Sequence, residues 1–165
     1  ELVRHGDFTA ISQRSTRYCD EDGSPWMWHP LIHQYLDNGP EAGWPIILDA
    51  QSSCQSGYAS LVAGIQDFLI ARGTDKATAR KQARGAARGL LGNALATELL
   101  FSANMSQWKR MMALRAHDAA DAEIRLMFND AFDLLSARWP DRWQGWTRQK
   151  AADGCGFMIC PPAAA

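Results

Sequence analysis

The sequence predicts an α+β fold that is mostly helical, with long helices packed on a short antiparallel sheet. Four segments after residue 50 are predicted to be helices from apolar residues at helical spacing or from capping residues, whereas the extended segments, near residues 2–3, 17–18 and 97–103, are short. The chain has 165 residues, of which 47% are hydrophobic and 21% charged. That length and composition are typical of a globular protein with one core.

The chain is expected to form one folded domain over residues 1–146, followed by an irregular, mobile tail over residues 147–165. No apolar period continues after Trp146, and chain ends without such a period are commonly mobile. The sequence opens on Glu1 without an initiator Met and enters a motif-like segment at once. We therefore expect that an N-terminal part of the protein is missing.

Charge and cysteine usage exclude several classes of protein. The formal net charge is −1, and no apolar run reaches the roughly 18–20 residues that span a bilayer. We therefore expect a cytoplasmic protein that binds neither nucleic acid nor membrane. The four cysteines match no zinc module, so we expect free thiols. A disulfide or metal site joining Cys155 and Cys160 is the alternative, because the segment between them is rich in glycine.

The first half of the chain is predicted to be irregular around one short helix. Residues 6–24 are rich in Ser, Thr, Gly and Asp, which favours a loop with a short extended piece near Arg17-Tyr18. A helix is predicted from His29-Pro30 to about Leu36, since proline suits a first helical turn. The Asn38-Gly39-Pro40 sequence then breaks this helix.

Four longer helices follow. The first begins near the capping residues Ser52-Ser53 and ends at Gly73, and the second is capped by Thr74 or Asp75 and ends near Leu91. The third begins near Ser106. The fourth covers about residues 119–139 and stops before Pro140.

An arginine stripe marks the second of these helices. Arg80, Arg84 and Arg88 are four residues apart, so their guanidinium groups lie on one face. This stripe is interpreted in two ways. It is a solvated face paired with carboxylates of another element, or it is a phosphate site, because arginine binds phosphate through two parallel hydrogen bonds.

The segment from Arg4 to Tyr18 is dense in Arg, Ser, Thr and Gln side chains. These groups are able to surround a phosphorylated ligand, and the alternative is a polar loop. A Ser-His-Asp triad is not supported, because the glycine pattern of a nucleophile elbow is absent. His29 and His33 have the spacing of a helical metal pair but no evident third ligand, so no metal site is predicted.

Two separated stretches resemble the flavin-dependent thymidylate synthases (the ThyX family). The first begins with Arg4-His5 and closes with Ser15-Thr16-Arg17-Tyr18, which is similar to the family motif of Arg-His-Arg, seven residues and Ser, ending in an Arg-Tyr pair. Gly6 replaces the third motif residue, and one extra residue precedes Ser15. The second stretch covers residues 80–125, from the arginine stripe to Asp121-Ala122-Glu123-Ile124-Arg125.

The resemblance implies roles for individual residues. It implies a dUMP site formed by Glu1, Arg4, Gln13, Ser15, Thr16, Arg17, Arg88 and Arg115. Within that site, Arg88 matches an arginine that binds the dUMP phosphate, and Arg115 matches the catalytic arginine that engages the uracil ring. It implies an FAD site formed by Arg4, His5, Gln13, Asn104, Ser106 and Arg110.

The implied activity is thymidylate synthesis. In this family the methylene of methylenetetrahydrofolate passes to C5 of dUMP through reduced FAD, NADPH is the reductant, and homotetramers share their active sites between subunits. Two alternatives stay open at this point. One is a flavin- and folate-dependent modification of another pyrimidine nucleotide, such as hydroxymethylation. The other is a non-catalytic nucleotide-binding paralogue.

Overall fold

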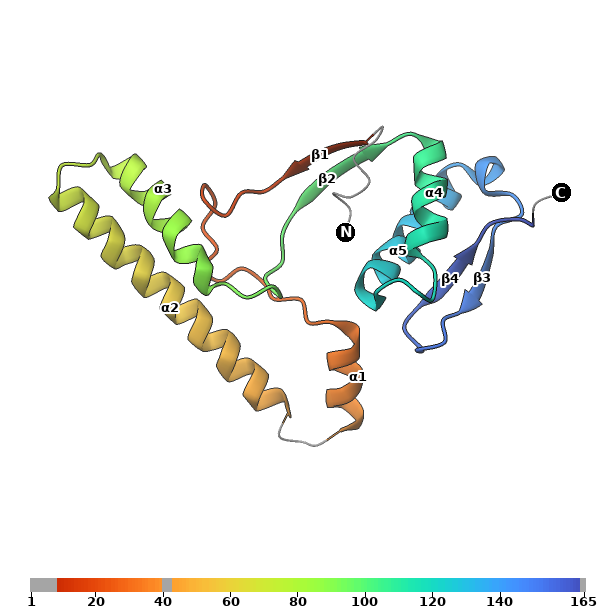
Figure 1. Ribbon diagram of the computed structural model, residues 1–165, viewed down its shortest axis with the longest axis horizontal. Helices are drawn as coiled ribbons and strands as arrows, with labels where there is room; N and C mark the ends of the chain where they lie inside the picture. The colour runs from red at the N-terminus through yellow and green to blue at the C-terminus, as the bar shows by residue number, and fades with distance from the viewer. Residues whose placement is uncertain (1–8, 40–42, 164–165) are drawn as a thin grey trace. The chain divides into compact units, whose positions relative to one another are not determined.

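The computed structural model describes residues 9–39 and 43–163, and this part of the chain is mostly helical. Its elements, in order, are β1 (Thr9–Gln13), α1 (Pro30–Asn38), α2 (Gly43–Ala71), α3 (Lys76–Ala87), the 3-10 helix η2 (Arg88–Leu90), β2 (Leu99–Ala103), α4 (Met105–Arg115), α5 (Ala122–Arg138), the 3-10 helix η3 (Pro140–Trp143), β3 (Thr147–Lys150) and β4 (Phe157–Cys160). The strands form two antiparallel pairs, β1 with β2 and β3 with β4 (Figure 1). The predicted α+β class is confirmed.

The chain is divided into two compact units. Within the described residues, the C-terminal unit comprises residues 9–12, 29–33 and 100–163, and the central unit comprises residues 13–28, 34–39 and 43–99. None of the described helices is long and apolar enough to cross a membrane. None of the four cysteines, all of which lie in the described part of the chain, forms a disulfide, so the alternative of a Cys155–Cys160 disulfide is wrong.

The central unit is built on the antiparallel pair of α2 and α3, which lie side by side (Figure 1). Asp75 caps α3 by accepting hydrogen bonds from the amides of Ala77 and Thr78, as predicted. Along α3, Ala79, Ala83 and Ala87 are fully buried at four-residue spacing. Small side chains at these positions allow α2 to approach closely. Each stripe arginine directly follows one of these alanines, so the stripe borders the buried face.

Helix α2 begins nine residues earlier than predicted, at Gly43 instead of Ser52. Pro45 occupies its third position. Proline is accommodated there because the first four amides of a helix have no intrahelical acceptor. The predicted end is confirmed, since Gly73 adopts a φ of +88° and its amide bonds the Ile70 carbonyl at 2.9 Å.

The C-terminal unit packs α4, α5 and the β3–β4 hairpin around one core (Figure 1). Its buried residues are Met111, Met112, Ala116, Phe128, Phe132, Trp143 and Ile159. The third and fourth predicted helices correspond to α4 and α5, and Asn104 and Asp121 cap them through their side chains. Pro140 ends the fourth as predicted and opens η3.

The prediction of an irregular tail is wrong for residues 147–160. Strands β3 and β4 pair antiparallel, with Thr147 opposite Cys160 and Lys150 opposite Phe157. Ile159 of β4 is only 2% exposed and belongs to the core. The strands form because this tertiary burial stabilises a segment whose own pattern is weak.

The polar N-terminal segment also contains a strand that was not predicted. Residues of β1 pair with β2, and the Arg14 amide bonds the Glu98 carbonyl at 3.0 Å. The extended piece expected near Arg17-Tyr18 is instead a turn, in which the amides of Tyr18 and Cys19 both bond the Ser15 carbonyl at 3.0 Å. Strand β1 forms because it pairs with β2, and its polar residues carry no local strand pattern that would predict it.

Candidate functional site

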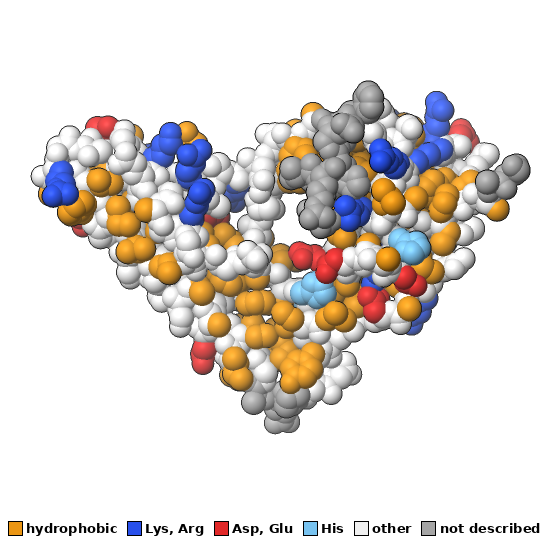
Figure 2. Space-filling view, viewed as in Figure 1, with side chains coloured by type: hydrophobic (Ala, Val, Ile, Leu, Met, Phe, Trp, Pro, Cys, Tyr) orange, Lys and Arg blue, Asp and Glu red, His pale blue; other side chains and the backbone are white. Residues whose placement is uncertain are grey.

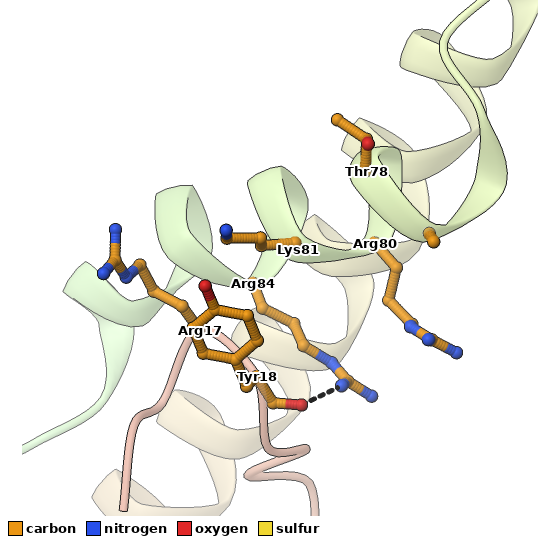
Figure 3. Close-up of a pocket in the computed structure, with 7 residues that line it drawn as sticks. Arg17, Tyr18, Thr78, Arg80, Lys81 and Arg84 are labelled. Carbon is orange, nitrogen blue, oxygen red and sulfur yellow. Dashed lines mark hydrogen bonds between the residues drawn. The ribbon is translucent and has the colours of Figure 1, made fainter.

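A hollow of about 260 Å³ lies in the central unit, between the turn at residues 15–19 and the face of α3 (Figure 3). Its lining residues are Arg17, Tyr18, Ala77, Thr78, Arg80, Lys81 and Arg84. Four of these side chains are cationic at neutral pH. The hollow is therefore strongly electropositive, and Figure 2 shows Lys and Arg side chains gathered over α3.

The turn at residues 15–19 places Arg17 and Tyr18 beside α3. The Ser15 carbonyl closes the turn, and the Ser15 hydroxyl accepts a further hydrogen bond from the Arg17 amide at 3.4 Å. The Arg17 stem passes over Gly85, where an added Cβ would meet Arg17 Cγ and Cδ at 3.5 Å. Gly85 therefore leaves the helix surface open to the Arg17 side chain.

Arg84 fastens this turn to α3. Its Nη1 donates to the Tyr18 carbonyl at 2.9 Å, and its Nη2 pairs with the Asp20 carboxylate at 2.5 Å. Its side chain is only 13% exposed. For Arg84, the interpretation of the stripe as a face paired with carboxylates is thus confirmed, and its charge is balanced by Asp20.

The other three cations of the hollow have no carboxylate partner among the described residues. Within residues 9–39 and 43–163, no carboxylate forms an ion pair with Arg17, Arg80 or Lys81. The Lys81 ammonium lies 4.6 Å from the centre of the Tyr18 ring. Its hydrogen bond and charge lower the pKa of the Tyr18 phenol, and Arg17 adds to that effect. Three unbalanced cations and a polarised hydroxyl suit an anion with several oxygens, such as a phosphate.

The backbone of α3 offers few free donors to the hollow. Its first turn lines the hollow, yet the amides of Ala77 and Thr78 already donate to Asp75 at 3.1 and 3.0 Å. The Asp75 carboxylate also opposes the positive end of the helix dipole. The donors that the hollow offers are therefore side chains.

The structure places five predicted site residues in the central unit. Gln13 ends β1 and is exposed, Ser15 and Thr16 are half-buried in the turn, and Arg17 lines the hollow. Arg88 begins η2 and is exposed. It follows Gly85 by three residues, so it shares the helix face that Arg17 crosses, although it does not line the hollow.

The remaining described candidates lie on α4 in the C-terminal unit. Asn104 is the N-cap, and its side-chain oxygen accepts from the Gln107 amide at 2.9 Å. Ser106 and Arg110 are exposed and four residues apart, so they share a face. Arg115 is half-buried in the last turn, about 140° around the helix from Arg110. Glu1, Arg4 and His5 lie outside the described residues.

Six of the seven lining residues were not among the predicted site residues: Tyr18, Ala77, Thr78, Arg80, Lys81 and Arg84. Arg80 belongs to the stripe and Tyr18 to the closing Arg-Tyr pair, so the sequence contained signals for both. No sequence pattern indicated Lys81, because it follows Arg80 and lies outside the four-residue spacing of the stripe. Among the described residues, no group of three or more His, Cys, Asp or Glu side chains is arranged to hold a metal.

Comparison with known proteins places the chain in a family. Residues 1–141 match the family described as thymidylate synthase complementing protein (Thy1). The chain is 32% identical over 166 residues to a flavin-dependent thymidylate synthase of Mycobacterium marinum, an alignment that covers 99% of this chain and 62% of the relative. It is 29% identical over 161 residues to the enzyme of the same name from Corynebacterium diphtheriae, covering 98% of this chain and 61% of that relative.

The chain therefore spans about three fifths of the length of these relatives. The family match covers both the turn that carries Arg17 and the helix that carries the arginine stripe. This chain belongs to the Thy1 family, the thymidylate synthase complementing proteins.

Proposed function

We propose that this protein is a flavin-dependent thymidylate synthase, which transfers the methylene group of methylenetetrahydrofolate to C5 of dUMP with NADPH as the reductant. The observation that carries the proposal is the electropositive hollow of Arg17, Arg80 and Lys81, in a chain of the Thy1 family. The phosphate of dUMP carries close to two negative charges at neutral pH. A hollow whose cations have no carboxylate partners among the described residues offers that group the complementary charge.

The phosphate end of dUMP is assigned to Arg17, Arg80 and Lys81 of the hollow together with Arg88, and Ser15, Thr16 and Gln13 line the nucleotide. Arg17 reaches α3 across Gly85, on the face that continues to Arg88. Guanidinium groups suit this task because their planar donors match phosphate oxygens in pairs. Glu1 and Arg4, which lie outside the described residues, complete the proposed dUMP site.

Arg115 is assigned to the uracil ring. Carbon C5 of uracil becomes nucleophilic as negative charge builds on N3 and O4, and a fixed guanidinium beside those atoms stabilises that charge. A preorganised donor of this kind contributes on the order of 3–4 kcal/mol to the transition state. None of the four cysteines has a place in this mechanism.

The residues proposed for FAD are Gln13, Asn104, Ser106 and Arg110, together with Arg4 and His5. At the start of α4, the exposed residues Ser106 and Arg110 share a face, and Asn104 is the N-cap of the same helix. This donor set fits the carbonyl and phosphate oxygens of a flavin nucleotide. Bound FAD supplies the redox and one-carbon transfer chemistry that side chains lack.

A homotetramer with shared active sites is part of the proposal. Ile46, Leu61 and Phe68 of α2 are 68%, 42% and 53% exposed, and helical geometry places them within about 60° of one another. Hydrophobic side chains follow α2 on the face seen in Figure 2. An exposed apolar helix face of this kind suits a contact between subunits.

Calorimetric titration with dUMP tests the proposed phosphate site. Arg17→Ala is expected to weaken dUMP binding about 10- to 100-fold, since hydrogen bonds to a charged group contribute about 1.5–3 kcal/mol. Lys76→Ala is the matched control, because Lys76 is an exposed cation of α3 that does not line the hollow. Equal dUMP affinities for the two variants would remove Arg17 from the site.

The absorbance spectrum and the reaction product separate the proposed enzyme from its alternatives. A yellow protein that converts dUMP to dTMP supports thymidylate synthesis. A yellow protein that yields a hydroxymethylated nucleotide supports the other pyrimidine modification. A colourless protein that still binds dUMP supports the non-catalytic paralogue.

A further inference from the structure

Arg125 of α5 is a fully buried arginine that the proposed chemistry does not use. Its Nε donates to the Cys155 carbonyl at 2.9 Å, and its Nη1 contacts three carbonyls of the α4–α5 loop, those of His117, Asp118 and Ala120, at 3.3, 3.3 and 3.1 Å. Its Nη2 pairs with the Asp153 carboxylate. A single buried side chain thus joins the loop at residues 116–121 to the turn of the C-terminal hairpin.

Two further hydrogen bonds join the same parts of the chain without Arg125. The Ile159 amide of β4 donates to the Ala116 carbonyl at 2.8 Å, and the Ala152 amide donates to the Asp118 carboxylate at 3.1 Å. The hairpin therefore holds the loop at its first residue, at Asp118 and through Arg125.

The hairpin turn is itself held by side-chain hydrogen bonds to its backbone. The Asp153 carboxylate accepts from the Cys155 amide at 2.9 Å, and the Asn129 side chain forms two hydrogen bonds with the backbone of Phe157, at 2.7 and 2.8 Å. Gly156 adopts a φ of +75°, and an added Cβ would lie 2.7 Å from Leu126 Cδ2. The carboxylate that balances Arg125 is thus held in place by its own turn.

The loop begins immediately after Arg115, the last residue of α4. Terminal carbonyls of a helix lack intrahelical partners, so the last turn frays unless other groups bind it. We propose that residues 147–160, acting through Arg125 and Asp153, form a clamp that fixes the end of α4 and so positions the Arg115 guanidinium. Arg125 and Asp153 are positioning residues in this proposal, which rests on the proposed function of Arg115.

The clamp is tested by Asp153→Asn, with Asp133→Asn as the matched control. Asp133 pairs with Arg148 of β3, so it joins the hairpin to α5 through a contact that does not involve the loop. The first measurement is the NMR order parameter of the Arg115 Nε–H bond in the full chain. Asp153→Asn is expected to lower it from about 0.85 to below about 0.6, whereas Asp133→Asn leaves it unchanged.

The second measurement is turnover of dUMP by the same two variants. Because Arg115 is proposed to act on charge that develops in the transition state, Asp153→Asn is expected to lower kcat at least tenfold and to leave KM for dUMP within about twofold. Asp133→Asn is expected to match the parent. If Asp153→Asn does not fold, Asp118→Ala removes an exposed link of the clamp and is expected to shift both measurements in the same direction.

Each outcome decides a separate point. An unchanged Arg115 order parameter in Asp153→Asn overturns the clamp, as does an equal loss of kcat in the two variants. A parent protein that neither binds nor converts dUMP contradicts the proposed function instead. In that case the order parameters still show whether the hairpin fixes Arg115.

Discussion

At the scale of single residues, the cations of the hollow differ in whether they have an ion-pair partner. Arg84 is committed to Asp20 and the Tyr18 carbonyl, whereas Arg17, Arg80 and Lys81 have no ion-pair partner among the described residues. Three cations held close together repel one another, and a bound anion relieves that repulsion. A hydrogen bond from Lys81, together with the charges of Lys81 and Arg17, lowers the pKa of the neighbouring Tyr18 phenol.

Removing Lys81 should therefore raise the pKa of Tyr18. The lowered pKa reflects stabilisation of the phenolate by the Lys81 ammonium, so Lys81→Met is expected to shift the phenol titration towards higher pH. Ultraviolet absorbance titration measures the shift, and Tyr18→Phe identifies which ionisation step belongs to this residue. Lys76→Met, outside the hollow, should leave the step where it is. An unmoved step in Lys81→Met would show that the two groups do not interact.

At the scale of elements, two glycines with positive φ illustrate different constraints. Gly23 has a φ of +72° with no atom within 4 Å of an added Cβ, whereas Gly156 has a similar φ of +75° in close contact with α5. At Gly23 only the backbone conformation resists a side chain. At Gly156 the packing of the hairpin against Leu126 and Asn129 resists it as well.

The two glycines give a matched pair of variants. Gly23→Ala is expected to lower the free energy of unfolding by about 1–2 kcal/mol, the cost of a left-handed conformation for alanine. Gly156→Ala is expected to lower it by about 2–5 kcal/mol, because overpacking adds about 1–3 kcal/mol. Urea unfolding measures both values. Equal losses would contradict the close packing of the hairpin turn against α5.

At the scale of the whole molecule, the exposed apolar face of α2 bears on assembly. Phe68→Glu is expected to dissociate the proposed tetramer, since a charge at a buried contact loses its water without gaining a partner. Sedimentation velocity measures the change. Ser52→Glu is the control, because Ser52 is exposed on α2 about 160° around the helix from Phe68. A parent that sediments as a monomer would contradict the tetramer itself.

Local chemistry in the sequence was sufficient for most helices and for the cationic face of α3. The Asp75 cap, Gly73 and Pro140 predicted helix ends correctly, because caps and breakers act within a few residues. The four-residue spacing of the stripe predicted a shared cationic face for the same reason. Strand β1 and the start of α2 were missed, since polar and proline-rich segments carry little local pattern.

What the sequence determined by itself was membership of the Thy1 family, the helical framework and the arginine stripe of α3. Only the tertiary structure decided that Asp20 neutralises Arg84, that Lys81 and Tyr18 join the hollow, and that residues 147–160 form a hairpin bound to Arg125. The physical reason is distance along the chain. Asp20 and Arg84 are 64 residues apart, and such partners meet only when packing brings their elements together.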